Sequence, residues 1–153
     1  MIRMSKRFFI ADIDKLDLSS PIRYERYYID DNTRIQLKGT IYELEKLDDN
    51  NVRTSKSNIS VDAFEELKRK SIKAIIRDSY LVNGYNGFSI KKYYCDYHGL
   101  NRLEIEFENA IEMETFIPEE WMGVEITNSP LAFDKFLSKL TKEEFLKEIA
   151  KYQ

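Results

Sequence analysis

Short segments in which apolar and polar residues alternate recur through most of this chain, and they constrain its fold more than any other feature. In 33–38, Ile35 and Leu37 share one face and the polar residues share the other, and 102–107 alternates as sharply. A period of two residues is typical of half-buried β-strands. Gly39 and the polar run 48–51 permit tight reversals, which indicates antiparallel hairpins and not βαβ units.

The alternations predict about eight strands, and three or four segments with helical spacing or capping residues predict helices. The predicted strands are 2–10, 21–29, 33–38, 41–47, 52–59, 72–82, 88–94 and 102–107, with a short candidate at 124–127, and the predicted helices are 61–70, a short one between Asn109 and Pro118, 130–140 and 141–152. Many short antiparallel strands must hide their edges, which favours a closed barrel over a flat sheet. At this length we expect a single domain, 1–153, of the α+β class.

Charge and composition exclude several classes of protein. The 24 Lys and Arg residues are outnumbered by 27 Asp and Glu, for a net charge of −3, so nucleic acid is not expected as a partner. One cysteine and one histidine exclude an internal disulfide and a multi-histidine metal cage. Because the sequence has no apolar run of about 18 residues, we expect no membrane span and a cytoplasmic location.

The polar faces of the predicted strands carry cations, serines and glutamates at period-two spacing. These sets are Arg3, Ser5 and Arg7; Arg34, Gln36 and Lys38; Arg53, Ser55 and Ser57; Ser89 and Lys91; and Glu104 and Glu106. One interpretation is that each set is a solvated strand face. The other is a barrel with a polar interior, which must hold water or a charged ligand because unpaired buried charge is costly.

The late part of the chain carries a more specific pattern. An E-x-E strand at 103–108 is followed by a short predicted helix and then by 116–127, which contains Pro118, Trp121, Gly123, Glu125, Ile126 and Thr127. This order resembles the C-terminal half of the CYTH domain, also called the triphosphate tunnel metalloenzyme superfamily. That family has an E-x-E strand, a helix and a P-x-W-x-G-x-E-V-T segment; here one extra residue separates Pro118 from Trp121.

Earlier strands resemble the family in the same order, so that the likeness spans nearly the whole chain. The segment 6–10 is similar to the end of the family's E-I-E-R-K-F-L-V strand, 34–36 to its R-x-R strand, 44–46 to its L-T-x-K strand, 53–57 to its R-x-E-x-E strand, and 76–80 to its K-x-R-Y strand. The resemblance implies an eight-stranded antiparallel tunnel-like β-barrel with peripheral and C-terminal helices. It further implies inward Arg and Lys that bind polyphosphate, and inward Glu that hold a divalent metal in active members.

Several carboxylates of the family pattern are missing here. Arg3, Ser5 and Arg7 replace the first-strand E-x-E-x-K, Ser55 and Ser57 replace an E-x-E, and Ser89 and Lys91 replace acidic positions; Gln36 and Ser79 replace two arginines. Mg²⁺ requires hard oxygen ligands, and phosphoryl transfer depends on charge neutralisation and a positioned nucleophile. We therefore expect damaged metal chemistry and a more positive interior that can hold an anion through charge-assisted contacts.

On this resemblance, the favoured function is that of a divergent CYTH-type tunnel protein that binds a phosphorylated anion and has lost or altered catalysis. The ligand classes are inorganic triphosphate, a nucleoside triphosphate or a related organophosphate. The candidate phosphate-binding residues are Arg7, Arg34, Lys46, Arg53, Arg77 and Lys91, and the candidate ligands for Mg²⁺ or Mn²⁺, if a metal is used at all, are Glu104 and Glu106.

Two alternatives stay open. The first is a metal-dependent triphosphatase that uses Glu104 and Glu106, with substitutes such as Glu25 or Glu43 for the missing carboxylates. The second is a structural or interaction protein whose cations form ion pairs inside the barrel with acids such as Glu125. The sequence leaves the oligomeric state, the protein partners and the identity of the ligand undetermined.

Overall fold

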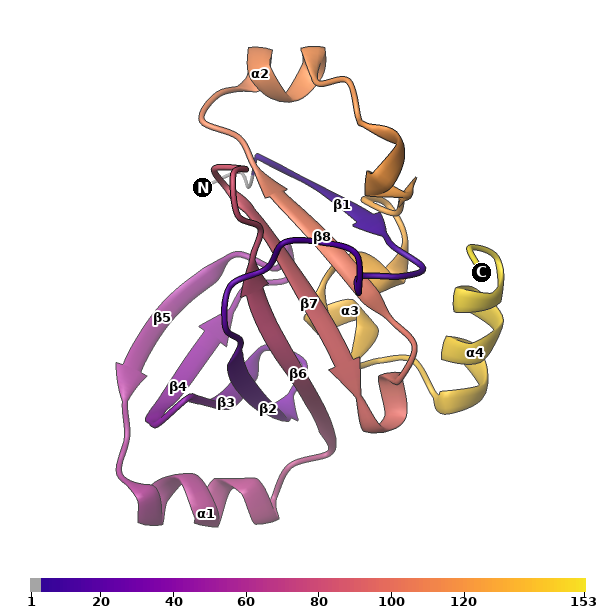
Figure 1. The fold of residues 1–153 in the computed structure, drawn as a ribbon. Helices are drawn as coiled ribbons and strands as arrows, with labels where there is room; N and C mark the ends of the chain where they lie inside the picture. Colours follow the sequence, from indigo (N-terminus) through magenta and orange to yellow (C-terminus); the bar gives the residue numbers. More distant parts are fainter. Residues whose placement is uncertain (1–3) are drawn as a thin grey trace.

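The computed structural model describes residues 4–153 and contains nine strands and four α-helices in that range (Figure 1). The strands are β1 Ser5–Phe9, β2 Ile22–Asp30, β3 Thr33–Lys38, β4 Ile41–Leu47, β5 Arg53–Asn58, β6 Lys73–Leu81, β7 Phe88–Tyr94, β8 Asn101–Glu106 and β9 Val124–Glu125. The helices are α1 Val61–Arg69, α2 Ala110–Thr115, α3 Asp134–Leu137 and α4 Lys142–Ala150, and the 3₁₀ turns are η1 Cys95–Tyr97, η2 Glu120–Met122 and η3 Pro130–Ala132. Residues 1–3, and with them the predicted position of Arg3, lie outside the described part of the chain.

Capping residues determine where the helices begin. The Ser60 side chain caps α1, and Thr141 and Glu144 form the capping box that opens α4, as their spacing predicts. The predicted helix 130–140 is instead divided into η3 and the single turn α3, because the backbone of Phe133 between them is extended.

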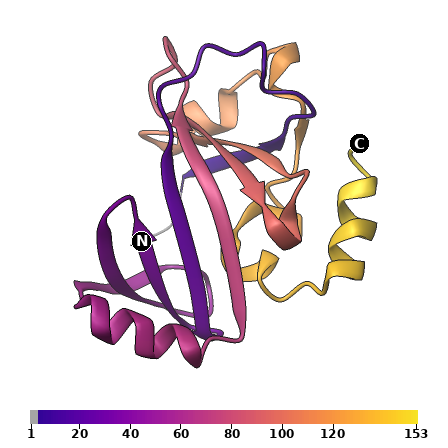
Figure 2. The same cartoon turned by 60° about the horizontal axis from the view of Figure 1, so that its bottom comes forward.

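All strands pair antiparallel in one sheet, in the order β5-β4-β3-β2-β6-β7-β8-β1-β9. Figures 1 and 2 show that the sheet is strongly curled. No pairing joins β5 to β9 within residues 4–153, so the antiparallel α+β fold is confirmed but the predicted closed eight-stranded barrel is not. β9 is only two residues long, and the chain then leaves the sheet for η3 and α3, which cover the inner face.

The inner face of the sheet is layered along the strands. Reading β1 toward its start gives Phe9, Arg7 and Ser5, and β6 repeats the order with Ile75, Arg77 and Ser79. The apolar layer packs against Leu131 and Leu137 of the C-terminal segment and against α4, in one hydrophobic core. On each of these two strands the cation lies two residues from the apolar residue and on the same face, because side chains at i and i+2 of a strand point to the same side. The cations therefore form a second layer next to this core.

The outer face of the sheet is covered at both ends, by α1 at one and by η2 with its neighbouring loops at the other. α1 lies across β2, β3 and β4, where Phe64 packs with Tyr27 and Ile35. A second core around Phe8, Leu103 and Met122 holds η2 against β1 and β8. No helix in the described range has the length and apolar character to cross a membrane.

Candidate anion-binding site

A cavity of about 190 Å³ lies inside the curl of the sheet, at the level of the cationic layer. Six cations line it, contributed by β1, β2, β3, β6, β7 and β8: Arg7, Arg26, Arg34, Arg77, Lys91 and Arg102. Two carboxylates, those of Glu104 and Asp134, line it as well. Positive side chains thus outnumber negative ones around a single, partly open cavity.

Glu104 is the counter-ion of the β1–β8 side of the cavity. Its Oε2 atom lies 2.8 Å from Arg7 Nη1 and 2.7 Å from Arg102 Nη2, while Lys91 Nζ lies 3.9 Å from its Oε1 atom. Burial opposes the charged form of this carboxyl, but the surrounding cations outweigh burial and lower its pKa. Glu104 is therefore a carboxylate held by arginines.

Asp134 reaches the same cavity from α3. Its Oδ2 atom accepts a hydrogen bond from Arg26 Nη1 at 3.0 Å, and its Oδ1 atom accepts from Arg102 Nη2 at 3.1 Å and from the Tyr93 hydroxyl at 2.5 Å. Arg77 Nε lies 3.3 Å from Oδ2. Burial raises the pKa of Asp134, but these arginines and the tyrosine hydrogen bond lower it well below its ordinary value.

A third carboxylate, that of Glu45, forms an ion pair with Arg34 of the cavity wall. Glu45 accepts a hydrogen bond from Arg34 Nε at 2.9 Å and one from Arg53 Nη1 at 3.2 Å. Burial acts against ionisation of Glu45, and the two arginines together with Arg26 lower its pKa to about 2. Arg34 is thereby fixed with its guanidinium at the cavity wall.

Arg77 and Lys91 are the cations least well matched by carboxylates. Arg77 Nε is buried and makes no hydrogen bond within residues 4–153, although Asp134 is near. Lys91 Nζ donates to two hydroxyls, those of Ser79 at 2.8 Å and Ser89 at 3.2 Å. Burial first, and then the neighbouring arginines, lower the pKa of Lys91 to about 8 against the pull of Glu104. Both cations line the cavity, and their ion-pair distances to its carboxylates are 3.3 Å or more.

The predicted phosphate-binding residues are only partly brought together. Four of them line the cavity: Arg7, Arg34, Arg77 and Lys91. Arg53 lies on the edge strand β5 with 48% of its side chain exposed, and it forms an ion pair with Glu45 behind the cavity wall. Lys46 is exposed on the other face of β4, since Glu45 and Leu47 on either side of it are buried.

Four residues of the site are not among those predicted from the sequence: Arg26, Arg102, Asp134 and Glu45. Arg102 stands two residues before Glu104, so the period-two rule could have found it. Arg26 lies in phase with Tyr28 on β2 in the same way. Asp134 has no comparable signal, because it comes from a one-turn helix whose position depends on the tertiary fold.

The residues proposed to bind metal do not suit a divalent ion. Glu104 is surrounded by four cations, and Glu106 has 56% of its side chain exposed and lies 4.0 Å from Arg7. No group of three or more His, Cys, Asp or Glu with a metal-binding arrangement occurs in the described range. Mg²⁺ prefers several oxygen ligands in octahedral geometry, and arginine groups bonded to those oxygens compete with it.

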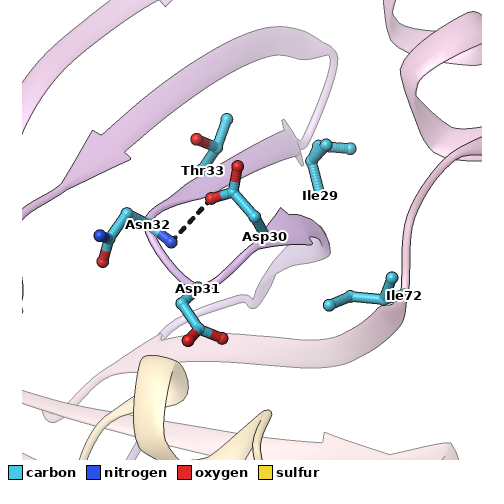
Figure 3. Close-up of a pocket in the computed structure, with 6 residues that line it drawn as sticks. All are labelled: Ile29, Asp30, Asp31, Asn32, Thr33 and Ile72. Carbon is cyan, nitrogen blue, oxygen red and sulfur yellow. Dashed lines mark hydrogen bonds between the residues drawn. The ribbon is translucent and has the colours of Figure 1, made fainter.

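A second cavity, of about 490 Å³, lies at the turn between β2 and β3 (Figure 3). Its polar lining is acidic, with Asp30 and Asp31, and Asn32 N donates to Asp30 Oδ1 at 2.9 Å. A cavity with this lining does not attract an anion. The amide oxygen of Asn32 instead accepts a hydrogen bond from Lys135 of α3.

Comparison with known proteins identifies the fold. No family model and no curated protein matches the chain. The crystal structure of the inorganic triphosphatase NE1496 matches with a TM-score of 0.72 and 20% identity, over 90% of this chain and 97% of that one. A crystal structure described as the hypothetical protein NE1496 gives a TM-score of 0.72 and 21% identity over the same shares. At this level of identity the two matches show that the chain shares the fold of NE1496, as the sequence resemblance predicts for the fold.

Proposed function

We propose that this protein binds a phosphorylated anion in the cationic cavity, without a divalent metal ion and with lost or altered catalysis. The candidate ligands are inorganic triphosphate, a nucleoside triphosphate and related organophosphates. The observation that carries the proposal is that six cations and two carboxylates line one cavity. Buried charge of one sign is costly, and a multivalent anion offsets it.

The arrangement of donors supports a phosphate ligand in particular. Arginine binds phosphate oxygens through its planar fork of N–H groups, and lysine adds a compact charge. Arg77 and Lys91 stand on adjacent strands, with the Ser79 and Ser89 hydroxyls beside them. These groups together offer charge and directional donors to one phosphate group.

The carboxylates of the cavity are poor candidates for catalysis. A general base must accept a proton from water, and its efficiency falls when its pKa lies far below the working pH. Arginines lower the pKa values of both Glu104 and Asp134. We therefore favour binding without turnover, although NE1496, the fold neighbour, is described as an inorganic triphosphatase.

The structural alternative explains part of the same geometry. Glu104, Asp134 and Glu45 each neutralise arginines, as an ion-paired interior requires. They leave the cavity with a surplus of positive charge, which favours an anion over a purely structural role. The cytoplasmic location stays a prediction from the sequence.

Calorimetric titration with inorganic triphosphate tests the proposal, once with EDTA and once with Mg²⁺ or Mn²⁺. We expect binding in EDTA and no phosphate release in either condition. The absence of both heat and a thermal shift at millimolar ligand would support the structural alternative. Rapid Mg²⁺-dependent phosphate release that is abolished by Glu104→Gln would support the triphosphatase alternative.

A further inference from the structure

The Asp134 carboxylate binds the cationic layer as an anionic ligand would. Its two oxygens contact Arg26, Arg77 and Arg102 and the hydroxyl of Tyr93, which come from β2, β6, β8 and β7. Only 1% of its side chain is exposed. Three guanidinium groups and a hydroxyl around two oxygens are also the kind of environment that binds a phosphate group.

Other donors of the arginines that Asp134 contacts are committed elsewhere in the protein. Arg102 also donates from Nε and Nη2 to Glu104 and from Nη1 to the Leu131 carbonyl. Arg26 donates from Nε to Gln36. A ligand therefore gains its most direct access to Arg26 and Arg102 at the positions that Asp134 holds.

The segment that carries Asp134 has little independent stability. α3 is four residues long, and a helix of one turn depends on tertiary contacts. Leu131 and Leu137 anchor the segment in the core at both ends. Between them, Lys135 Nζ donates to Asn32 Oδ1 and to the Asp48 carbonyl, both at 2.5 Å, which ties α3 to two turns of the sheet.

We propose that Asp134 is an internal competitor of the ligand: its carboxylate occupies the position of one phosphate group and leaves Arg26, Arg77 and Arg102 when the ligand binds. This inference rests on the proposed function, since it concerns the same cavity. The ligand-free protein is then an autoinhibited state, in which α3 supplies the negative charge. A bound phosphorylated anion replaces that charge and releases the α3 segment.

Titration of wild type and Asp134→Asn with inorganic triphosphate in EDTA tests the competition. Removing the competing charge is expected to tighten binding by on the order of tenfold. The matched control is Asp78→Asn, because Asp78 is ion-paired with Arg23 on the outer side of β6, away from the cavity lining. Its affinity is expected to equal that of wild type.

Hydrogen exchange of wild-type residues 129–141, with and without triphosphate, provides a readout that needs no variant. Release of α3 predicts faster exchange in this segment when ligand is bound. If Asp134 only holds the arginines in place, Asp134→Asn will bind triphosphate no more tightly than wild type does, and triphosphate will slow the exchange of 129–141 in wild type. Either result overturns the inference and leaves the proposed function intact.

The stability of Asp134→Asn is measured alongside by thermal unfolding. If this variant does not fold, the exchange experiment on wild type decides the question alone. If neither wild type nor a folded Asp134→Asn binds triphosphate, the proposed function fails, and the inference fails with it.

Discussion

Arg7 and Glu104 face each other across the β1–β8 pairing, with 2.8 Å between Arg7 Nη1 and Glu104 Oε2. The family resemblance implies a metal-binding role for Glu104, whereas its neighbours here are guanidinium groups. Ser5 of β1, at the position where the resembled pattern has a Glu, provides no carboxylate on this side of the cavity. The geometry makes Glu104 a counter-ion that fixes the cationic wall of the cavity.

Replacement of this counter-ion should destabilise the ligand-free protein. Glu104→Gln removes the nearest carboxylate from Arg7 and one of the two carboxylates that contact Arg102, and removal of one partner from a buried ion pair costs about 3–5 kcal/mol. Urea unfolding measures the loss. Glu106→Gln is the matched control: its side chain is 56% exposed, and we expect a change of at most about 0.5 kcal/mol. Equal losses in the two variants would contradict the assigned role.

Arg77→Gln should weaken binding of inorganic triphosphate. Its guanidinium lines the cavity, and a hydrogen bond to a charged group contributes about 1.5–3 kcal/mol, or roughly tenfold to a hundredfold in affinity. Calorimetry in EDTA measures the effect. Arg23→Gln, at a half-exposed arginine on the outer face, should bind as wild type does. Similar affinities for all three proteins would remove Arg77 from the site.

Binding should also weaken as pH rises through the pKa of Lys91. Burial lowers that pKa from 10.5 to about 8, so the ammonium loses its proton near pH 8 in the ligand-free protein and then attracts the anion less. Titrations between pH 7 and 9 should show this decline in wild type but not in Lys91→Met. Comparison of the two proteins at each pH cancels changes in the charge of the ligand. A decline of the same size in Lys91→Met would contradict the role of Lys91.

The same lowered pKa has a consequence for stability. Between pH 8 and 10.5 the unfolded chain keeps the Lys91 proton that the folded protein has lost, so the free energy of unfolding gains a positive Lys91 contribution as pH rises. Unfolding of wild type and Lys91→Met across this window isolates the contribution. Lys92→Met, on the outer face of β7, is the control and should keep the wild-type slope. A slope in Lys91→Met equal to that of wild type would contradict the prediction.

Gly123 holds β9 against β1. Its φ is +79°, and a Cβ atom would lie 2.0 Å from the Phe9 carbonyl oxygen, so Gly123→Ala forces the two strands apart. Gly84 has a φ of +84° with no atom within 4 Å, and Gly84→Ala therefore measures the backbone strain alone, about 1–2 kcal/mol. Thermal unfolding should show a larger loss for Gly123→Ala. Equal losses would mean that the close approach relaxes at no cost.

The antiparallel fold could be predicted because apolar and polar residues alternate clearly along most strands. The cations of β1, β6 and β7 are in phase with the buried residues Phe9, Ile75 and Tyr93, so their inward direction follows from the period of two. On β3, Arg34 shares its face with Gln36, and Ile35 and Leu37 lie on the other face. β4 lacks this information: α1 covers its outer face, where Leu44 packs near Phe64, while Leu47 is buried on the inner face. Apolar residues on both faces leave the inward face of β4 ambiguous, so the alternation could not test the prediction of Lys46, which followed from the resemblance of 44–46 to an L-T-x-K strand.

Two further features depend on tertiary contacts that a local pattern does not encode. Closure of the sheet requires pairing between β5 and β9, and the period of the strands is the same whether that pairing forms or not. Asp134 reaches the cavity only because the extended Phe133 separates η3 from α3. Most charged residues of the cavity wall could therefore be predicted from the sequence, but the Asp134 carboxylate that enters the cavity from α3 could not.

A crystal structure of the protein grown with inorganic triphosphate and EDTA would show whether the cationic cavity binds a phosphorylated anion without a metal ion. We predict triphosphate in the cavity, with phosphate oxygens on Arg77 and Lys91 and the Asp134 carboxylate displaced. Triphosphate found only outside the cavity, or no bound triphosphate at saturating concentration, would contradict it.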